Sequence, residues 1–348
     1  MDATKKKSTF KDIIGKLGPL LALVILCIAL GIATGGTFFS AANISNLFRQ
    51  VPIVALMAVG MLCVILLGGI DLSAGSLLAI GCMASGVMMQ KFFDADTVVN
   101  SIILILICLA VSTLCGVING LLLTKLHLPH PFIATLGMKN ICRGVALLIS
   151  GSAAIAGFPK ATLIIGAKDV FSVKLGAWGN FALPVSFLLT VIVFVIMHIF
   201  LSRTALGRKI YSFGGNAEAA RLAGINTDNV QIFCYGMSGF MCGLAGVIYI
   251  GRLNSAVPLA SQEGDLDAIA SCIIGGASFL GGKGNVWGTL IGAFMIQVIR
   301  NGCNLLGVSS DLQQIVIGAI IIIAVFIDVV RTAMEAKAKR LAVAKENG

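Results

Sequence analysis

Long apolar runs alternate with short polar segments along the chain, and this pattern predicts its main elements. Several runs reach the roughly 20 residues that an α-helix needs to cross a bilayer. The pattern therefore predicts an all-α, polytopic membrane protein with about ten transmembrane helices, because helices satisfy their own backbone hydrogen bonds in lipid. The apolar segments are Leu17–Thr34, Val51–Leu67, Leu72–Met89, Val99–Thr124, Pro131–Ser150, Phe181–Leu201, Val230–Ile250, Leu266–Leu280, Val286–Leu306 and Leu312–Val330.

Basic residues predict the orientation of these helices, because cytoplasmic loops of membrane proteins collect Lys and Arg. An even number of spans places both termini on one side. With both termini in the cytoplasm, the basic tails 1–16 and 332–348 lie inside, together with the polar segment 202–228. Residues 17–331 then form a single transmembrane domain. Residues 151–180 lie outside, either as an ordered loop that covers a pore mouth or receives a partner, or as a solvated connector.

The composition supports a membrane protein and excludes other classes. The 348 residues are 58% hydrophobic and 11% charged, with a mean hydropathy of +1.01, whereas soluble domains contain about 25% charged residues. The net charge of +10 calls for no nucleic acid, because cytoplasmic loops of a membrane protein account for it. The ten cysteines fall in apolar stretches without Cys-x-x-Cys spacing, and the three histidines form no metal motif. We therefore expect packing cysteines and no metal site.

A short helix is predicted in the middle of the polar segment 202–228. Asn216 can cap its start, Glu218 stands in the first turn, where the helix dipole favours an anion, and Gly224 ends it. A capped helix between two membrane spans is rigid and can transmit force from a partner. The alternative is a stable loop helix without a partner. The residues concerned are Gly214, Gly215, Asn216, Glu218, Ala219, Ala220, Arg221 and Gly224.

A glycine pair interrupts the apolar pattern near residue 70. Gly68 and Gly69 break the helix, and Asp71 or Ser73 can cap the next one. Irregular backbone at membrane depth is tolerated only where protein or a water-filled cavity satisfies it. The interruption is therefore either a tight turn at the membrane surface or a break that lines a transport path.

A second glycine cluster spans residues 275–292 but matches no nucleotide-binding pattern. A Walker motif needs Gly six residues before Lys283, where Ala277 stands, and Ser or Thr after it, where Gly284 stands. The pairs Gly239/Gly243 and Gly288/Gly292 are better explained as close helix–helix contacts, within one subunit or across a dimer.

Several polar residues lie within the predicted spans, where a charge is costly and marks a functional candidate. Arg143 is such a charge, unless it pairs structurally with Asp71 or with backbone carbonyls. Helix-dipole stabilisation accounts for Glu263, Asp265 and Asp267 ahead of a helix. The candidates for the translocation path are Asp71, Ser73, Asn119, Thr135, Arg143 and Asn301.

Taken together and in order, these motifs resemble the permease subunits of bacterial ribose, xylose and galactose ABC importers. The resemblance rests on residues 68–76, 131–137, 214–224, 266–270 and 275–292, and it covers nearly the whole chain. It implies a homodimer in the bacterial cytoplasmic (inner) membrane, an ATPase with two fused nucleotide-binding halves, and an extracytoplasmic sugar-binding protein. ATP and Mg would then be cofactors of the partner ATPase, which would dock on the segment 202–228.

Other functions remain open at this point. Permeases of the same mechanism carry nucleosides, branched-chain amino acids or a furanosyl signalling molecule. An ion-coupled secondary transporter predicts several ionisable groups at mid-membrane, and the sequence offers mainly Asp71 and Arg143. A membrane enzyme would need a cluster of His, Cys or Asp with catalytic spacing, and none is found.

Overall fold

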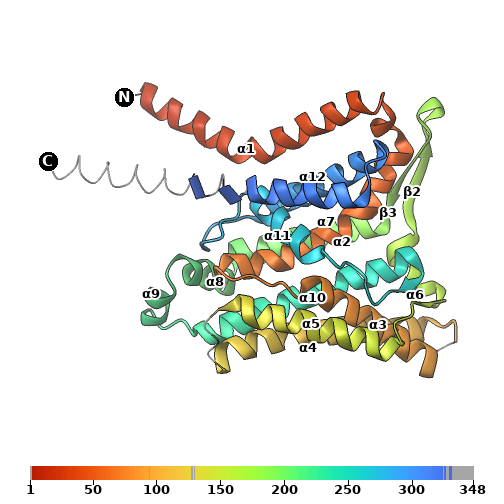
Figure 1. Cartoon of the computed structure of the whole chain (residues 1–348). Coiled ribbons are helices and arrows are strands. Elements are labelled where there is room, and N and C mark those ends of the chain that lie inside the picture. Colours follow the sequence, from red (N-terminus) through yellow and green to blue (C-terminus); the bar gives the residue numbers. More distant parts are fainter. Residues whose placement is uncertain are drawn as a thin grey trace.

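The computed structural model describes residues 2–93, 95–126, 128, 130–323, 325–326 and 329–330, with nearly all side chains from residue 18 onward. This part of the chain is mostly helical, and its long helices run roughly along one axis (Figure 1). The predicted C-terminal tail, residues 332–348, lies outside the described residues, as do the side chains of the predicted N-terminal tail, residues 1–16.

Helix α2, Ala41–Leu66, forms the core of the molecule and is buried over most of its length. Its last turns are apolar on every face, which is typical of a helix surrounded by protein. Helices α10 (Thr227–Leu253), α11 (Gly264–Ile274) and α12 (Val286–Leu305) pack against it. Helix α1 (Asp2–Ala33) rests on α12 and reaches α2 through a turn that contains the 3₁₀ helix Thr37–Phe39.

Helices α4 (Val98–Lys125) and α10 approach each other so closely that their backbones touch. A Cβ added to Gly239 on α10 would lie 2.4 Å from the carbonyl oxygen of Ser112, and one added to Gly116 on α4 would lie 2.4 Å from that of Tyr235. Gly243 continues this contact against Leu109. Such contacts need small residues. Helices α3 (Ala74–Phe92) and α5 (Pro131–Ser150) complete this side of the bundle.

The glycine pair on α12 contacts α11 in the same way. A Cβ on Gly288 would lie 2.1 Å from the carbonyl oxygen of Gly275, and one on Gly292 would lie 1.9 Å from that of Ser271. Both predicted glycine pairs therefore lie against helices of the same chain.

Residues 151–184 form ordered structure at one end of the bundle, on the right of Figure 1. Strand β1 (Ile155–Ala156) pairs antiparallel with β4 (Ser255–Ala256), and β2 (Asp169–Lys174) pairs antiparallel with β3 (Asn180–Pro184). Helix α6 (Lys160–Ala167) and a 3₁₀ turn (Gly176–Trp178) connect them. An ion pair of 2.7 Å between Arg49 and Asp169 ties the hairpin to α2.

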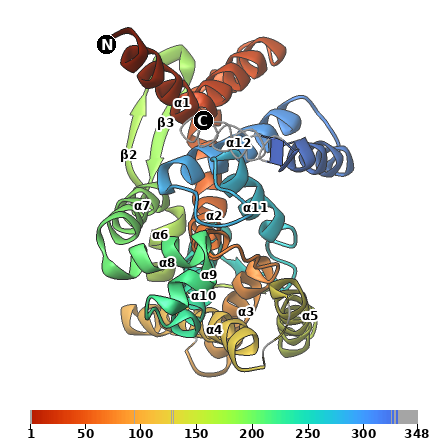
Figure 2. The same ribbon diagram turned by 90° about the vertical axis from the view of Figure 1, so that its left-hand side faces the viewer.

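Helices α7 (Val185–Arg203), α8 (Ala205–Gly215) and α9 (Ala217–Leu222) lead to the opposite end. Helices α8 and α9 lie there together with the start of α1, on the left of Figure 1, and Figure 2 looks onto this end. The hairpin of β2 and β3 and the segment 202–228 thus occupy opposite ends, which agrees with the predicted topology.

One predicted span has the wrong form. The structure replaces Leu266–Leu280 by α11, an 11-residue helix that ends at Gly275. Gly276 then adopts a φ of +91°, which turns the chain away from the helix axis. Eleven residues cover about 16 Å, half of a hydrocarbon core of about 30 Å. The hydropathy of the sequence overestimated the length of this helix because the turn that follows it, residues 275–280, is itself apolar.

Five helices in the described chain are long and apolar enough to cross a membrane: α2, α4, α5, α7 and α10. The apolar helices Gly18–Ala33 and Ser310–Ile323 are shorter. The polytopic helical architecture is confirmed, whereas the count of ten crossings and the cytoplasmic termini stay predictions.

Candidate functional site

Helix α9 projects from the end of the bundle and is capped as the sequence predicts. The side chain of Asn216 accepts a hydrogen bond from the backbone N–H of Ala219 at 2.9 Å, and Gly224 has a φ of +81° just after the helix. Ala220 faces inward and is buried. Glu218 forms an exposed ion pair of 2.8 Å with Arg221. The outer face of α9 is therefore free to meet a partner.

Helix α8 connects α9 to the end of α2 and to the turn after α11. This contact is a glycine junction, made of Gly68, Gly214, Gly281 and Gly282. The N–H of Gly282 donates to the carbonyl of Leu66 at 2.9 Å. A Cβ on Gly214 would lie 1.7 Å from that same carbonyl oxygen, and one on Gly281 would lie 2.8 Å from the nitrogen of Gly68. The end of α8, the end of α2 and the turn after α11 thus meet backbone to backbone.

A side-chain contact reinforces the glycine junction. The hydroxyl of Tyr211 on α8 donates to the carbonyl of Gly284 at 2.9 Å. Helix α8 therefore contacts both the break after α2 and the turn between α11 and α12.

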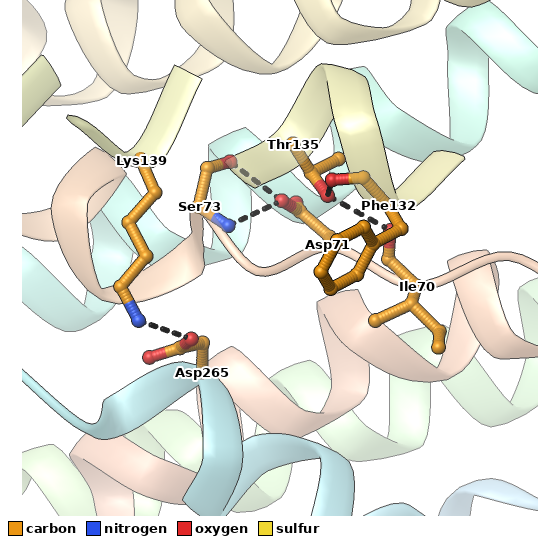
Figure 3. A network of polar contacts seen from close by, with 7 residues as sticks. All are labelled: Ile70, Asp71, Ser73, Phe132, Thr135, Lys139 and Asp265. Carbon is orange, nitrogen blue, oxygen red and sulfur yellow. Dashed lines mark hydrogen bonds and ion pairs between the residues drawn. The ribbon is translucent and has the colours of Figure 1, made fainter. Parts of the chain in front are cut away.

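Asp71 lies at the centre of a buried polar network beside the break (Figure 3). Its Oδ1 accepts from the N–H of Ser73 at 3.0 Å and from the Ser73 hydroxyl, and its Oδ2 accepts from the hydroxyl of Ser238 at 2.8 Å. Asn119 on α4 donates from Nδ2 to the Ser73 hydroxyl at 2.8 Å. All four residues are 0% exposed. In this conformation Asp71 faces neither surface water nor an open cavity, so it braces the break against α4 and α10.

The carbonyl of Ile70, next to Asp71, collects further donors. It accepts from the hydroxyl of Thr135 on α5 at 3.4 Å and from that of Tyr235 on α10 at 3.3 Å. The structure therefore brings Asp71, Ser73, Asn119 and Thr135 to one place. Tyr235 and Ser238 could not be predicted from the sequence, because a hydroxyl in an apolar helix carries no mark of its distant partner.

Charged residues join α5 to α11 and the segment before it. Nζ of Lys139 lies 2.7 Å from Oδ2 of Asp265, whose side chain is fully buried (Figure 3). Arg143 donates from Nη1 to the carbonyls of Pro258 at 2.7 Å and Ala260 at 2.9 Å. Arg143 thus meets backbone carbonyls, one of the partners considered from the sequence, and does not reach Asp71.

The remaining polar candidate lies in a different contact. Asn301 on α12 exchanges two hydrogen bonds with Asn43 on α2, at 2.8 and 3.0 Å. It is nearly buried and stands apart from Asp71. The preceding residue, Arg300, pairs with Asp267 at 2.8 Å. The first-turn acids of α11 therefore have ion-pair partners as well as the helix dipole.

Replacement of Asp71 by asparagine should leave transport close to that of the wild type. The N-cap of α3 is Ser73 and not Asp71, but asparagine keeps Oδ1 as the acceptor for Ser73, and its amide N–H can donate to the hydroxyl of Ser238 in place of the present bond. Asp71→Ala should instead prevent recovery of folded protein, since each buried donor left without an acceptor costs about 1–3 kcal/mol. Uptake per folded molecule and thermal unfolding in detergent measure the two effects. A stable Asp71→Asn protein that transports nothing would show that the charge itself serves transport.

The described residues offer no site for a metal ion. No group of three or more His, Cys, Asp or Glu side chains gathers within this part of the chain. The ten cysteines are all free.

Comparison with known proteins identifies relatives over most of the chain. The family model described as branched-chain amino acid transport system / permease component matches residues 43–325. The ribose import permease RbsC of Bacillus subtilis is 38% identical over 329 residues, 94% of this chain and 97% of the relative. The D-allose permease AlsC of Escherichia coli is 35% identical over 93% of this chain and 94% of the relative. The xylose permease XylH of Haemophilus influenzae is 33% identical over 89% and 94%. No solved structure matches the chain.

Proposed function

The chain belongs to the family of branched-chain amino acid transport system permease components, and we propose that it carries a monosaccharide as the permease subunit of an ABC importer. Like its relatives, it is a transport component and not an enzyme. The observation that carries the proposal is the identity of 38% with a ribose import permease over nearly the full length of both chains. Relatives named for xylose and allose point to the same class of solute.

We further propose the assembly in which the chain works. Two copies form the path, an ATPase with two fused nucleotide-binding halves binds ATP and Mg, and an extracytoplasmic binding protein delivers the sugar. The complex lies in the bacterial inner membrane, and each permease crosses about ten times with both termini in the cytoplasm. The exposed face of α9 and the glycine junction support this assembly, because they provide a docking surface and a rigid link to the interrupted helices.

Partner identification tests this proposal. The tagged protein is extracted from its native membrane in mild detergent, and the proteins purified with it are identified by mass spectrometry. We expect an ATPase with two nucleotide-binding halves in stoichiometric amount. Proteoliposomes that contain both proteins and a binding protein should then take up sugar only when ATP is supplied.

An ion-coupled secondary transporter is the alternative. It needs ionisable groups that change partners during transport, whereas Asp71 is fixed by three hydrogen bonds and Arg143 by two carbonyls. A chain that purifies alone and moves sugar without ATP would favour this alternative and contradict our proposal.

A further inference from the structure

Helix α11 begins deep within the bundle. Ser261, just before this helix, donates from its hydroxyl to Sδ of Met57 on α2 at 3.5 Å. Met57 lies nine residues before the end of α2, which corresponds to about 13 Å along the helix. The irregular segment 257–263 therefore lies beside the interior of α2, one of the helices long and apolar enough to cross a membrane. Irregular backbone at membrane depth is tolerated only where it is buried in protein or lines a water-filled cavity, and interrupted helices of this kind mark substrate sites in transporters.

A pocket opens where this segment meets α12 and the apolar helix Ser310–Ile323. Its volume is about 340 Å³, at the lower end of the range of about 300–1,000 Å³ for small-molecule sites. We call it the α11 pocket. It is lined by Ser261, Gln262, Glu263, Gly264, Asp267, Gln297, Arg300 and Gln314.

Two of these side chains have hydrogen-bonding capacity that the described chain does not use. Gln297 on α12 is only 6% exposed, and its amide makes no hydrogen bond to any described residue. Nε of Arg300 is also buried without a partner among the described residues. Both residues belong to the lining of the α11 pocket. Nε of Arg300 is itself shielded from solvent, so the amide of Gln297 is the unpaired group that a solute in the pocket can reach. Such a solute would supply hydrogen bonds that the described chain does not make.

The lining selects one chemical class of solute. It contains hydroxyl, amide, carboxylate and guanidinium groups and no apolar side chain. Sugar hydroxyls donate to carboxylates and accept from amide and guanidinium N–H groups, so a neutral polyol can use every side of the pocket. A branched-chain amino acid would place its aliphatic group against polar atoms and leave them without hydrogen bonds.

We propose that the α11 pocket holds the monosaccharide during its passage, with the amide of Gln297 bonded to a sugar hydroxyl. The assignment rests on the proposed import of a monosaccharide and adds the place where the permease touches it. Arg300 keeps its ion pair with Asp267, and both residues line the pocket beside Gln297. Glu263, 3.9 Å from Arg300, supplies an acceptor at the rim of the same pocket.

The test compares Gln297→Met with the wild type in the complete importer, reconstituted in proteoliposomes with its ATPase, its binding protein and ATP. Methionine keeps the length of glutamine and removes its hydrogen bonds. The probes are labelled D-ribose and its 2-deoxy, 3-deoxy and 5-deoxy analogues. We expect D-ribose uptake to fall about tenfold, the effect of one lost hydrogen bond. The penalty for a deoxy analogue is the ratio of D-ribose uptake to uptake of that analogue. For the analogue that lacks the hydroxyl bound by Gln297, this ratio should fall by a similar factor in Gln297→Met, because the variant no longer bonds to that hydroxyl in D-ribose. Preferences of the binding protein cancel in this ratio.

Gln90→Met is the matched control, because Gln90 is exposed at the end of α3 and lies outside the pocket. It should change neither uptake nor the ratios. Wild-type uptake by Gln297→Met would overturn the assignment, and so would unchanged penalties for all three analogues, since a packing defect slows every sugar equally. Failure of the wild-type importer to move D-ribose, D-xylose or D-allose would count against the proposed function instead.

Discussion

Replacement of Gly214 by alanine should reduce ATP-driven sugar uptake at least tenfold. The added Cβ would lie 1.7 Å from the carbonyl oxygen of Leu66 and 2.5 Å from the nitrogen of Gly282. Both atoms belong to the backbone, so no side-chain rotation relieves the clash, and the end of α8 must separate from the end of α2. We expect ATP hydrolysis to continue without sugar movement, because α9 keeps its shape while its link to the interrupted helices is lost. Uptake and ATPase activity in the same proteoliposomes measure the two rates.

The neighbouring residue provides the control for this experiment. A Cβ on Gly215 would have no atom within 4 Å apart from its chain neighbours, and Gly215 has no positive φ. Gly215→Ala makes the same chemical change one position along the chain and should transport normally. If Gly214→Ala also coupled ATP hydrolysis to uptake normally, the glycine junction would not transmit the movement of α9.

Replacement of Glu218 by lysine should abolish binding of the ATPase while the permease stays folded in the membrane. Glu218 is largely exposed, and its ion pair with Arg221 is an i,i+3 pair of 2.8 Å. Losing such a pair costs about 0.2–0.5 kcal/mol, and a cation at a helix N-terminus costs about 0.3–1 kcal/mol. These costs are small beside a stability of about 5–15 kcal/mol. A large loss of function would therefore come from the docking surface, where two positive charges replace an ion pair.

Co-purification of the ATPase with the tagged variant measures this effect, and thermal unfolding in detergent checks the fold. Asp228→Lys reverses a charge in the same polar segment, 202–228, but outside α9, at the start of α10, and should leave the complex intact. An active, intact complex with Glu218→Lys would show that the ATPase docks elsewhere.

Local features of the fold could be predicted from the sequence because their causes are local. Asn216 begins α9 through its side chain, which accepts from the N–H of Ala219, and Gly224 ends it through its positive φ. The break after Leu66 follows from Gly68, whose φ is +77°. Apolar runs of sufficient length located α2, α4, α5, α7 and α10, since bilayer thickness alone sets that requirement.

Features that depend on distant partners could not be predicted. Lys139 and Asp265 are 126 positions apart in the sequence, and nothing in the sequence indicated that they form a pair. The short α11 was missed because a hydropathy profile records apolar content and not the direction of the backbone. The α11 pocket combines residues of three separate elements, so the amide of Gln297 gave no sign of its exposure to a cavity.

The backbone contact between α4 and α10 limits how the molecule can move. Where Gly116 and Gly239 touch, sliding or twisting would drive main-chain atoms into one another, so the two helices behave as a single rigid plate. The contacts between α5 and the region of α11 consist instead of long Lys and Arg side chains, which can follow a change in the spacing of these elements while they keep their partners. Alternating access should therefore open along this charged seam, with the plate of α4 and α10 as the fixed frame.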